Sequence, residues 1–516
     1  MVFIEENVEI KNIHYDGMIV LDFKKQAMSI NLGGELEPYH YPFRGVAQRS
    51  VLIAQNVKKY LVIKPYNLLN MPFPFFDNES VSRLYPANLQ LKKLILFHRH
   101  GERTPVDAER KPWKMCFLSP QLHNFYVAAE KFTGKDHSPE SPASEGSSTK
   151  YSNSNISNLL NFSGVIFEGN DSKVKNLKAL NFFDNFADNG SCLTGQLTDI
   201  GKLSMQKLGG NLRNLYVDQL HFIRGELDDK TKNNVYVRST DYARTIESVQ
   251  YLLNGFFPNQ YRVEKNWSLP IHIKSEETET LYPSDASKIA VDLSKAFKVR
   301  VRKELQPAID DIVLRMKKIG INVAPRMNKL HHLNDYFLCM KGNGVQLPPD
   351  VTDSDLEDLE RICVKDWWEK YQVDPLLCKY SISGLMKDLK SDLLETDRKS
   401  KVSIYSGHDS TLGPLLSAFQ AFDSKIPPFS SIINIEVFEE KKTMFNFFKN
   451  NAYVRLLYNG KVVKIPHCQD NSRNLNGDGS FCKINSFLEA VEKMIPSKQD
   501  EENDAKVVDV EQVNVR

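Results

Sequence analysis

The chain has 516 residues, of which 41 % are hydrophobic and 26 % are charged, a composition typical of globular proteins with a sizeable core. Its 67 basic and 65 acidic residues give a net charge of +2, which excludes recruitment of nucleic acid or anionic membranes by a global field. An anionic substrate would therefore need a local cluster of positive charge. No run of about 18 apolar residues occurs, so we predict no membrane span.

The first ten residues, Met1–Ile10, carry three glutamates and lack a basic segment followed by an apolar one. They match neither a secretory signal nor an arginine-rich transit peptide, and we predict a cytoplasmic protein. A mitochondrial or secretory address is the alternative if the N-terminus is incomplete. The secretory alternative is favoured by N-x-[ST] sequons at Asn78, Asn155, Asn161, Asn170, Asn189 and Asn266.

Seven cysteines in a chain of this length are too sparse for a disulfide scaffold, and no two of them form a C-x-x-C pair. Cys468 and Cys482 lie 14 positions apart in a loop-like stretch that contains Asn, Gly and Asp. A disulfide between them and two separate thiols fit this pattern equally well.

Residues 1–85 hold only short apolar stretches and indicate no partner, so we predict an N-terminal extension of unknown role. The predicted main domain spans 86–500 and opens with Leu94–Phe97, an apolar run without alternation. Such a run is typical of a strand buried on both faces of a parallel sheet. Residues 133–157 are rich in Ser, Pro, Asn and Gly and are predicted to form a solvated insertion loop.

The next elements alternate between helix and strand. Thr198 is a candidate N-cap, because apolar residues recur after it at roughly helical spacing. A short strand is predicted at Val235–Val237 and a helix at Ala243–Phe257. Further strands are predicted at Val402–Tyr405, Ile432–Phe438 and Val454–Tyr458.

Residues 285–400 show apolar periodicity near 3.6, which predicts an inserted, mostly helical cap subdomain. The acidic segment 501–516 lacks aromatic residues and is predicted to be a mobile tail. Strands that alternate with helices predict an α/β fold, with a three-layer α/β/α sandwich as its core. In open α/β sheets, ligands bind beyond the carboxyl ends of the strands. The polar clusters that follow the two buried strands should therefore face each other.

The first polar cluster is the string Arg99-His100-Gly101-Glu102-Arg103-Thr104-Pro105. Arginine binds oxyanions well, because its fork donates two parallel hydrogen bonds. A deprotonated histidine between two arginines can attack an electrophile. Gly101 allows the backbone to approach a ligand closely. The cluster therefore predicts a nucleophile in an oxyanion-binding loop.

Two more clusters follow predicted strands. Gly407-His408-Asp409-Ser410-Thr411 comes directly after Val402–Tyr405, and Arg238-Ser239-Thr240-Asp241 comes with Arg244-Thr245 after Val235–Val237. One arginine of the latter cluster could reach the same anion. A helix cap with a salt bridge is the alternative interpretation, above all for Arg244.

These motifs together resemble the histidine acid phosphatases of the phosphoglycerate-mutase-like superfamily, with the lysophosphatidic acid and prostatic acid phosphatase branches as the most similar. The resemblance runs from about Leu91 to Ile495 and includes three further segments: Gly195-Gln196-Leu197-Thr198, Leu281-Tyr282-Pro283 and Lys425-Ile426-Pro427-Pro428-Phe429. It implies a phosphoglycerate-mutase-like fold. It also implies that His100 is the nucleophile, that Asp409 is the proton donor, and that the phosphate is bound by Arg99, Arg103, Arg238 and His408.

The resemblance implies hydrolysis of a phosphate monoester through a phosphohistidine intermediate. Three arginines and a protonated His408 would neutralise the phosphate, so we expect neither a cofactor nor a metal. Asp409 would donate a proton to the leaving group, which predicts an acidic optimum. His331-His332 has no evident ligand partner in the sequence and is assigned no metal. Lysophosphatidic acid is a substrate candidate by resemblance alone, and the oligomeric state is not predicted.

Two other functions remain alternatives. A phosphoglycerate-mutase-like phosphotransferase would share the nucleophile and fold but would pass the phosphate to a second acceptor. A non-catalytic phosphate-binding protein would keep the arginines, although the intact His100 and Asp409 argue against it.

Overall fold

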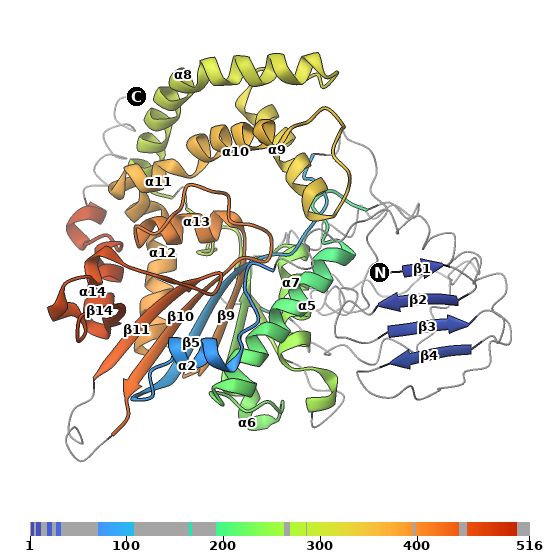
Figure 1. Ribbon diagram of the computed structural model, residues 1–516. Coiled ribbons are helices and arrows are strands. Elements are labelled where there is room, and N and C mark those ends of the chain that lie inside the picture. The colour runs from blue at the N-terminus through green and yellow to red at the C-terminus, as the bar shows by residue number, and fades with distance from the viewer. Residues whose placement is uncertain are drawn as a thin grey trace, which may run out of the picture. The chain divides into compact units, whose positions relative to one another are not determined.

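The computed structural model describes residues 71–107, 192–262, 269–284, 286–395, 399–442 and 451–502, and the backbone of five further strands (Figure 1). The chain divides into two compact units. One comprises Met1–Asn70 with Met340–Gln346, and the other comprises Met71–Cys339 with Leu347–Arg516. The predicted insertion loop at 133–157 and the final residues 503–516 lie outside the described part of the chain.

The first unit contains a four-stranded antiparallel sheet in which sequence neighbours pair in order. Its strands are β1 (Val2–Ile4), β2 (Asn7–Lys11), β3 (Met18–Asp22) and β4 (Ala27–Asn31). The sheet falls within residues 1–85, for which the sequence predicts an extension of unknown role.

The second unit is built on a ten-stranded mixed sheet with the order β13-β14-β11-β10-β5-β9-β7-β8-β6, and with β12 paired to β11. The strands are β5 (Leu89–Arg99), β6 (Val165–Phe167), β7 (Val235–Ser239), β8 (Ile271–Ile273), β9 (Val402–Gly407), β10 (Ile432–Glu440), β11 (Ala452–Tyr458), β12 (Lys461–Val463), β13 (Asn474–Leu475) and β14 (Asp478–Lys483). The two predicted buried strands are neighbours, because β5 and β9 pair in parallel from Leu94 opposite Val402 to Arg99 opposite Gly407.

Helices cover both faces of this sheet, which confirms the predicted three-layer arrangement (Figure 1). Leu94 and Leu96 of β5 pack with α5 (Asp199–Arg213) and α7 (Ala243–Phe256). Ile95 and Phe97 point to the opposite face, where the core includes α12 (Pro375–Leu394), α13 (Asp409–Ala418) and α14 (Ile484–Lys493). Because both faces of the sheet are covered, β5 has no exposed side along Leu94–Phe97, which explains why this run lacks alternation.

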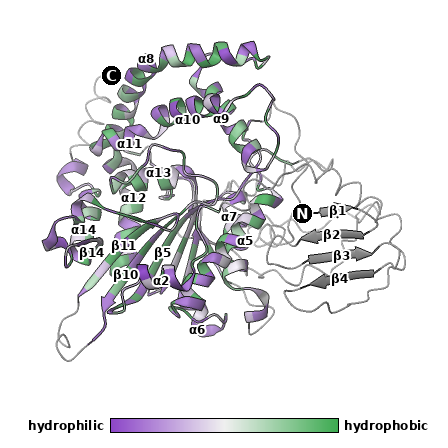
Figure 2. Ribbon diagram, viewed as in Figure 1, coloured by the Kyte–Doolittle hydropathy of each residue, from purple (hydrophilic) through white to green (hydrophobic). Residues whose placement is uncertain are grey.

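Five helices fill the region predicted to form the cap. They are α8 (Lys288–Lys318), α9 (Met327–Gly342), α10 (Asp353–Trp367), α11 (Glu369–Val373) and α12. The longest, α8, buries Phe297, Val301, Leu305 and Ile309 on one stripe, and Figure 2 shows hydrophilic residues interleaved with hydrophobic ones along it. No helix in the described part of the chain is both long and apolar enough to cross a bilayer.

The helices α5 and α7 approach each other through glycines. A Cβ added to Gly209 would lie 1.9 Å from the carbonyl oxygen of Leu252, and one added to Gly255 would lie 1.9 Å from that of Gln206. Backbone therefore packs directly on backbone at this crossing. By contrast, a Cβ added to Gly210 would meet no atom within 4 Å.

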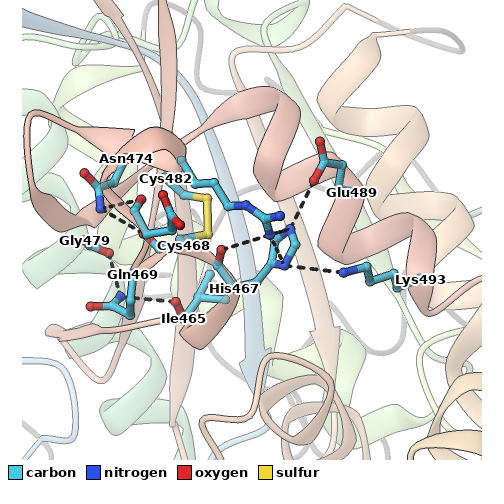
Figure 3. Close-up of a disulfide and its surroundings, with 11 residues drawn as sticks. Ile465, His467, Cys468, Gln469, Asn474, Gly479, Cys482, Glu489 and Lys493 are labelled. Atoms are coloured by element: carbon cyan, nitrogen blue, oxygen red, sulfur yellow. Dashed lines mark hydrogen bonds and ion pairs between the residues drawn. A yellow bond between two sulfur atoms is a disulfide. The ribbon is translucent and has the colours of Figure 1, made fainter.

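Cys468 and Cys482 form a disulfide, which resolves the alternative that the sequence left open (Figure 3). The neighbouring loop is fixed by side-chain amides: Asn474 Nδ2 donates to the Cys468 carbonyl at 3.1 Å, and Gln469 Nε2 donates to the Gly479 carbonyl at 3.1 Å. Cys192 is also disulfide-bonded, whereas Cys363 and Cys378 are buried thiols.

The described start of the predicted tail is held against α12. Lys379 Nζ pairs with Asp500 at 2.7 Å, and Lys387 Nζ with Glu501 at 3.4 Å. The Tyr380 hydroxyl donates to the carbonyl of Asp500. Charge complementarity with the lysines of α12 thus holds Asp500 and Glu501, which lie at the boundary between the predicted main domain and the predicted tail.

Candidate active site

The three polar clusters of the sequence meet at the carboxyl edge of the sheet. The parallel strands β5, β9 and β7 lie side by side and end at Arg99, Gly407 and Ser239. Backbone hydrogen bonds extend the alignment beyond the strands, since His100 N donates to the Gly407 carbonyl at 3.0 Å. The side chains that follow the strands therefore converge, as the sequence predicts.

The ring of His100 is buried, and one of its nitrogens is hydrogen-bonded to the backbone. Its Nδ1 lies 2.8 Å from the Gly101 carbonyl oxygen, which can only accept, so Nδ1 carries the proton. The lone pair of the neutral ring is then on Nε2. Burial and the charges of Arg244, Arg99 and Arg103 hold the pKa of His100 well below its usual value. His100 therefore keeps a nucleophilic nitrogen in mildly acidic solution.

The guanidinium of Arg99 links the nucleophile region to α13. Its Nη2 pairs with Asp409 Oδ2 at 2.8 Å, its Nη1 donates to the Pro427 carbonyl at 2.5 Å, and the group stacks over the Phe429 ring. Asp409 is the first residue of α13, and its side chain is 24 % exposed. Asp409 is thus a partly exposed acidic group that pairs with Arg99, the residue directly before His100.

Arg103 is held by a carboxylate that the sequence analysis did not single out. Asp335, on α9, accepts from Arg103 Nη2 at 2.7 Å and from Nη1 at 3.2 Å, and also accepts from the Val106 backbone N–H. Burial alone would raise the pKa of Asp335, but the charge and hydrogen bonds of Arg103 outweigh it and hold this pKa low. The pair therefore remains ionised and fixes the orientation of the guanidinium.

Arg244 reaches the centre of the cluster. Its Nη2 lies 3.4 Å from His408 Nδ1, and its guanidinium stacks over the Tyr242 ring at 4.4 Å. The rings of His100 and His408 lie 5.6 Å apart, and Tyr242 packs edge-on against His408. Burial and the nearby charge of Arg103 lower the pKa of Arg244 to about 10, so it remains a cation.

Arg238, which the sequence analysis expects to bind phosphate, pairs with other residues than those of this cluster. It lies on β7 with the same side-chain direction as Tyr236 and therefore faces the α12 layer. There it pairs with Glu279 and, at 2.6 Å, with Asp388 Oδ2 of α12. Thr280 accepts another of its hydrogen bonds at 2.7 Å. Two carboxylates thus already neutralise the guanidinium.

The donors of the cluster exceed its acceptors. The Nε atoms of Arg99 and Arg244 are buried and have no hydrogen-bond partner within the described residues. Three arginines face two carboxylates, Asp335 and Asp409, so the cluster carries excess positive charge. Such an arrangement suits an anion with several acceptor oxygens.

Two buried groups beside the cluster have shifted pKa values. Burial lowers the pKa of His98 from 6.5 to about 4, and burial raises the pKa of Glu102 from 4.5 to about 7. The histidines of α9 are placed differently from what the sequence suggests. His331 Nε2 pairs with Asp366 at 3.0 Å and His332 Nδ1 with Asp107 at 3.1 Å, so both have carboxylate partners.

Comparison with known proteins identifies the family. The model of the histidine phosphatase superfamily (branch 2) matches residues 90–337 and 353–459. A probable acid phosphatase of Schizosaccharomyces pombe is 25 % identical over 468 residues, covering 80 % of this chain and 93 % of that protein. Human lysophosphatidic acid phosphatase type 6 is 25 % identical over 323 residues, covering 58 % of this chain and 67 % of that protein.

A solved structure supports the fold. The phytase from Citrobacter braakii aligns with a TM-score of 0.50 at 12 % identity, covering 79 % of this chain and 98 % of that chain. At this identity the likeness concerns the fold alone. The family match covers both the strand-end cluster around His100 and the one around Asp409. The chain therefore belongs to the histidine phosphatase superfamily, branch 2, and is a phosphatase of the acid phosphatase family.

Proposed function

We propose that this phosphatase hydrolyses phosphate monoesters through a phosphohistidine on His100. The observation that carries the proposal is the convergence of Arg99, Arg103 and Arg244 on one buried, neutral imidazole, with Asp409 beside them. Positive groups fixed around a nucleophile stabilise the charge of a phosphoryl group as it is transferred.

The reaction follows from the roles of the side chains. His100 Nε2 attacks phosphorus while Nδ1–H remains bonded to the Gly101 carbonyl. A phosphate that competes for Arg99 releases Asp409, which then holds a proton and gives it to the leaving oxygen. Water next attacks the phosphohistidine, with Asp409 as the base. The product is inorganic phosphate, and His100 is regenerated.

The proposed phosphate-binding set contains Arg244 in place of Arg238. The charge of Arg244 helps to hold the pKa of His100 below its usual value, whereas Arg238 is neutralised by Glu279 and Asp388. His408, whose ring lies beside that of His100, completes the set.

Lysophosphatidic acid is our proposed substrate class among the phosphate monoesters. Human lysophosphatidic acid phosphatase type 6 is named for that activity. The resemblance to it covers 58 % of the present chain. The rings of Phe429 and Tyr242 flank the two histidines and offer apolar contacts near the leaving group. Phe97 makes no such contribution, because it stacks on Tyr405 in the core.

We also propose that the protein works in an oxidising compartment, the secretory alternative of the sequence analysis. Disulfides persist in such compartments and are rare in the cytosol. The Cys468–Cys482 bond, the disulfide of Cys192 and the exposed sequon at Asn78 support this choice. Digestion with a glycosidase that removes N-linked glycans tests it, and an unchanged mass for Asn78 and the other sequons would favour the cytoplasm.

The test of the phosphatase proposal is phosphate release from p-nitrophenyl phosphate and from lysophosphatidic acid, in EDTA, from acidic to mildly basic pH. We expect activity on the acid side that is abolished in His100→Ala and retained in the control His467→Ala, whose ring lies at the disulfide (Figure 3). Labelled phosphate from the substrate that stays bound to the wild type after quenching without acid would identify the phosphohistidine. Label transferred only to an added acceptor would favour a mutase, and binding without turnover would favour a phosphate-binding protein.

A further inference from the structure

A chain of hydrogen bonds runs from Arg244 through His408 to two buried threonines. Arg244 Nη2 lies 3.4 Å from His408 Nδ1, and His408 Nε2 lies 2.9 Å from Thr240 Oγ1. Thr240 Oγ1 in turn lies 2.9 Å from Thr245 Oγ1. Thr240 and Thr245 have no exposed surface, so water does not compete for these contacts.

The direction of the chain follows from which groups can donate. A guanidinium has only donors, so His408 Nδ1 accepts from Arg244 and carries no proton. A neutral imidazole has one N–H, which is then on Nε2 and points to Thr240 Oγ1. At the far end, the Thr245 hydroxyl has carbonyl acceptors, at 2.9 Å on Tyr242 and at 3.1 Å on Thr240.

Only one orientation satisfies every member. If Thr245 donates to a carbonyl, Thr240 must donate to Thr245, and Thr240 then accepts from His408 Nε2–H. The reverse orientation would place an Nδ1–H against the N–H groups of Arg244, so that two donors would oppose each other, which costs free energy. The geometry therefore selects the Nε2–H tautomer.

We propose that Thr240 and Thr245 are positioning residues that keep His408 neutral with its lone pair on Nδ1, so that Nδ1 takes up the acidic proton of a singly ionised phosphate monoester. The O–H bond of the phosphate breaks as the Nδ1–H bond forms, and the electron pair stays on the phosphate oxygen. The ring becomes a cation beside the doubly charged phosphate, and its Nε2–H remains bonded to Thr240. This substrate step rests on the proposed phosphatase function, but the tautomer does not.

The expectation that His408 enters the reaction protonated is thereby revised. Among the described residues, the charged and titratable groups around the ring include Tyr242 just before α7, Arg244 within α7, His100 after β5, and Asp409 in α13. In the free enzyme, a protonated His408 would be repelled by the positive charge of Arg244. A proton that arrives with the substrate avoids this repulsion, because it comes with compensating negative charge.

The first measurement is nitrogen NMR of the full chain labelled at histidine, with His408→Gln used to assign the ring. We expect the free wild type to show a protonated Nε2 and an unprotonated Nδ1, and inorganic phosphate at mildly acidic pH to protonate Nδ1. A protonated Nδ1 in the free wild type would overturn the proposal. If the spectra show the Nε2–H tautomer but the protein releases no phosphate from a substrate, the positioning role is supported and only the proposed function is overturned.

Variants separate positioning from structural support. Thr240→Val should mix the tautomers and raise KM roughly tenfold to a hundredfold with a smaller change in kcat, while Thr240→Ser should restore both. Ser239→Ala is the matched control, since Ser239 is equally buried and donates to the Thr240 carbonyl instead of to His408. Unchanged ring spectra in Thr240→Val, or equal effects of Ser239→Ala, would contradict the proposal.

Discussion

Glu102→Gln should change how the stability of the protein depends on pH. Burial raises the pKa of Glu102 from 4.5 to about 7, so in this window the folded protein holds a proton that the unfolded chain has lost. The free energy of unfolding therefore falls as pH rises from 4.5 to 7. Glutamine resembles the protonated carboxyl and does not titrate, so the free energy of unfolding of the variant does not fall for this reason as pH rises.

The magnitude follows from the two pKa values of Glu102. A difference of about 2.5 corresponds to about 3.4 kcal/mol, at 1.36 kcal/mol for each unit. His98 acts in the opposite sense, because burial lowers its pKa from 6.5 to about 4 and the unfolded chain takes up the proton first. Between pH 4.5 and 6.5 the two groups offset each other in the wild type. In the variant, the acid sensitivity of His98 is no longer compensated.

The assay is urea unfolding at pH 4.5 and at pH 7.5, with extrapolation of the free energy to water. The free energy of unfolding of Glu102→Gln, relative to that of the wild type, should be about 3 kcal/mol higher at pH 7.5 than at pH 4.5. Glu226→Gln is the control, because that carboxylate is 58 % exposed and pairs only at the surface with Arg224. A stability difference between variant and wild type that is the same at both pH values would refute the reasoning.

Three more outcomes are expected. Arg244→Ala should lower kcat/KM about 10²–10³-fold in steady-state assays with little loss of stability, whereas Arg238→Met should cost about 3–5 kcal/mol of stability by leaving buried carboxylates uncompensated. Equal effects on kcat/KM would contradict this assignment. Gly255→Ala should lose about 1–3 kcal/mol in urea unfolding, and the control Gly210→Ala should lose nothing. Replacing both residues of Cys468–Cys482 by serine should cost about 3 kcal/mol by loop entropy, and an unchanged unfolding midpoint would argue against the bond.

The strands of the core were predictable because burial on two faces leaves a strong local signature. Leu94–Phe97 is a continuous apolar run and Val402–Tyr405 is apolar except for Ser403, and both are buried in the structure. The meeting of the polar clusters then follows from the general rule that places ligand sites beyond the carboxyl ends of parallel strands. This much of the fold and the convergence of His100 with His408 needed no knowledge of distant contacts.

The choice between Arg238 and Arg244 could not be made from the sequence. Arg238 lies near the end of β7 and Arg244 follows it within a few residues, and their roles depend on partners far along the chain. Asp388 lies 150 positions from Arg238, and no local pattern announces that this carboxylate faces β7. The side-chain direction on β7 was the one available signal, since Tyr236 and Arg238 must share a face.

Asp335 was missed for the same reason. It lies within an ordinary helical pattern, 232 positions after Arg103, and only the packing of α9 brings the two together. A carboxylate that binds an active arginine has no sequence signature of its own. Its role becomes visible only when both ends of the pair are placed.

The glycine crossing of α5 and α7 limits how this enzyme can vary. Arg244 stands at the start of α7, and a Cβ on Gly201 of α5 would lie 2.1 Å from the carbonyl oxygen of Glu102. Where backbones touch, there is no side chain to shorten, and every substitution adds volume. A substitution at these glycines therefore requires the backbones themselves to separate, so even the smallest side chain would shift the segment that carries Arg244 or Glu102.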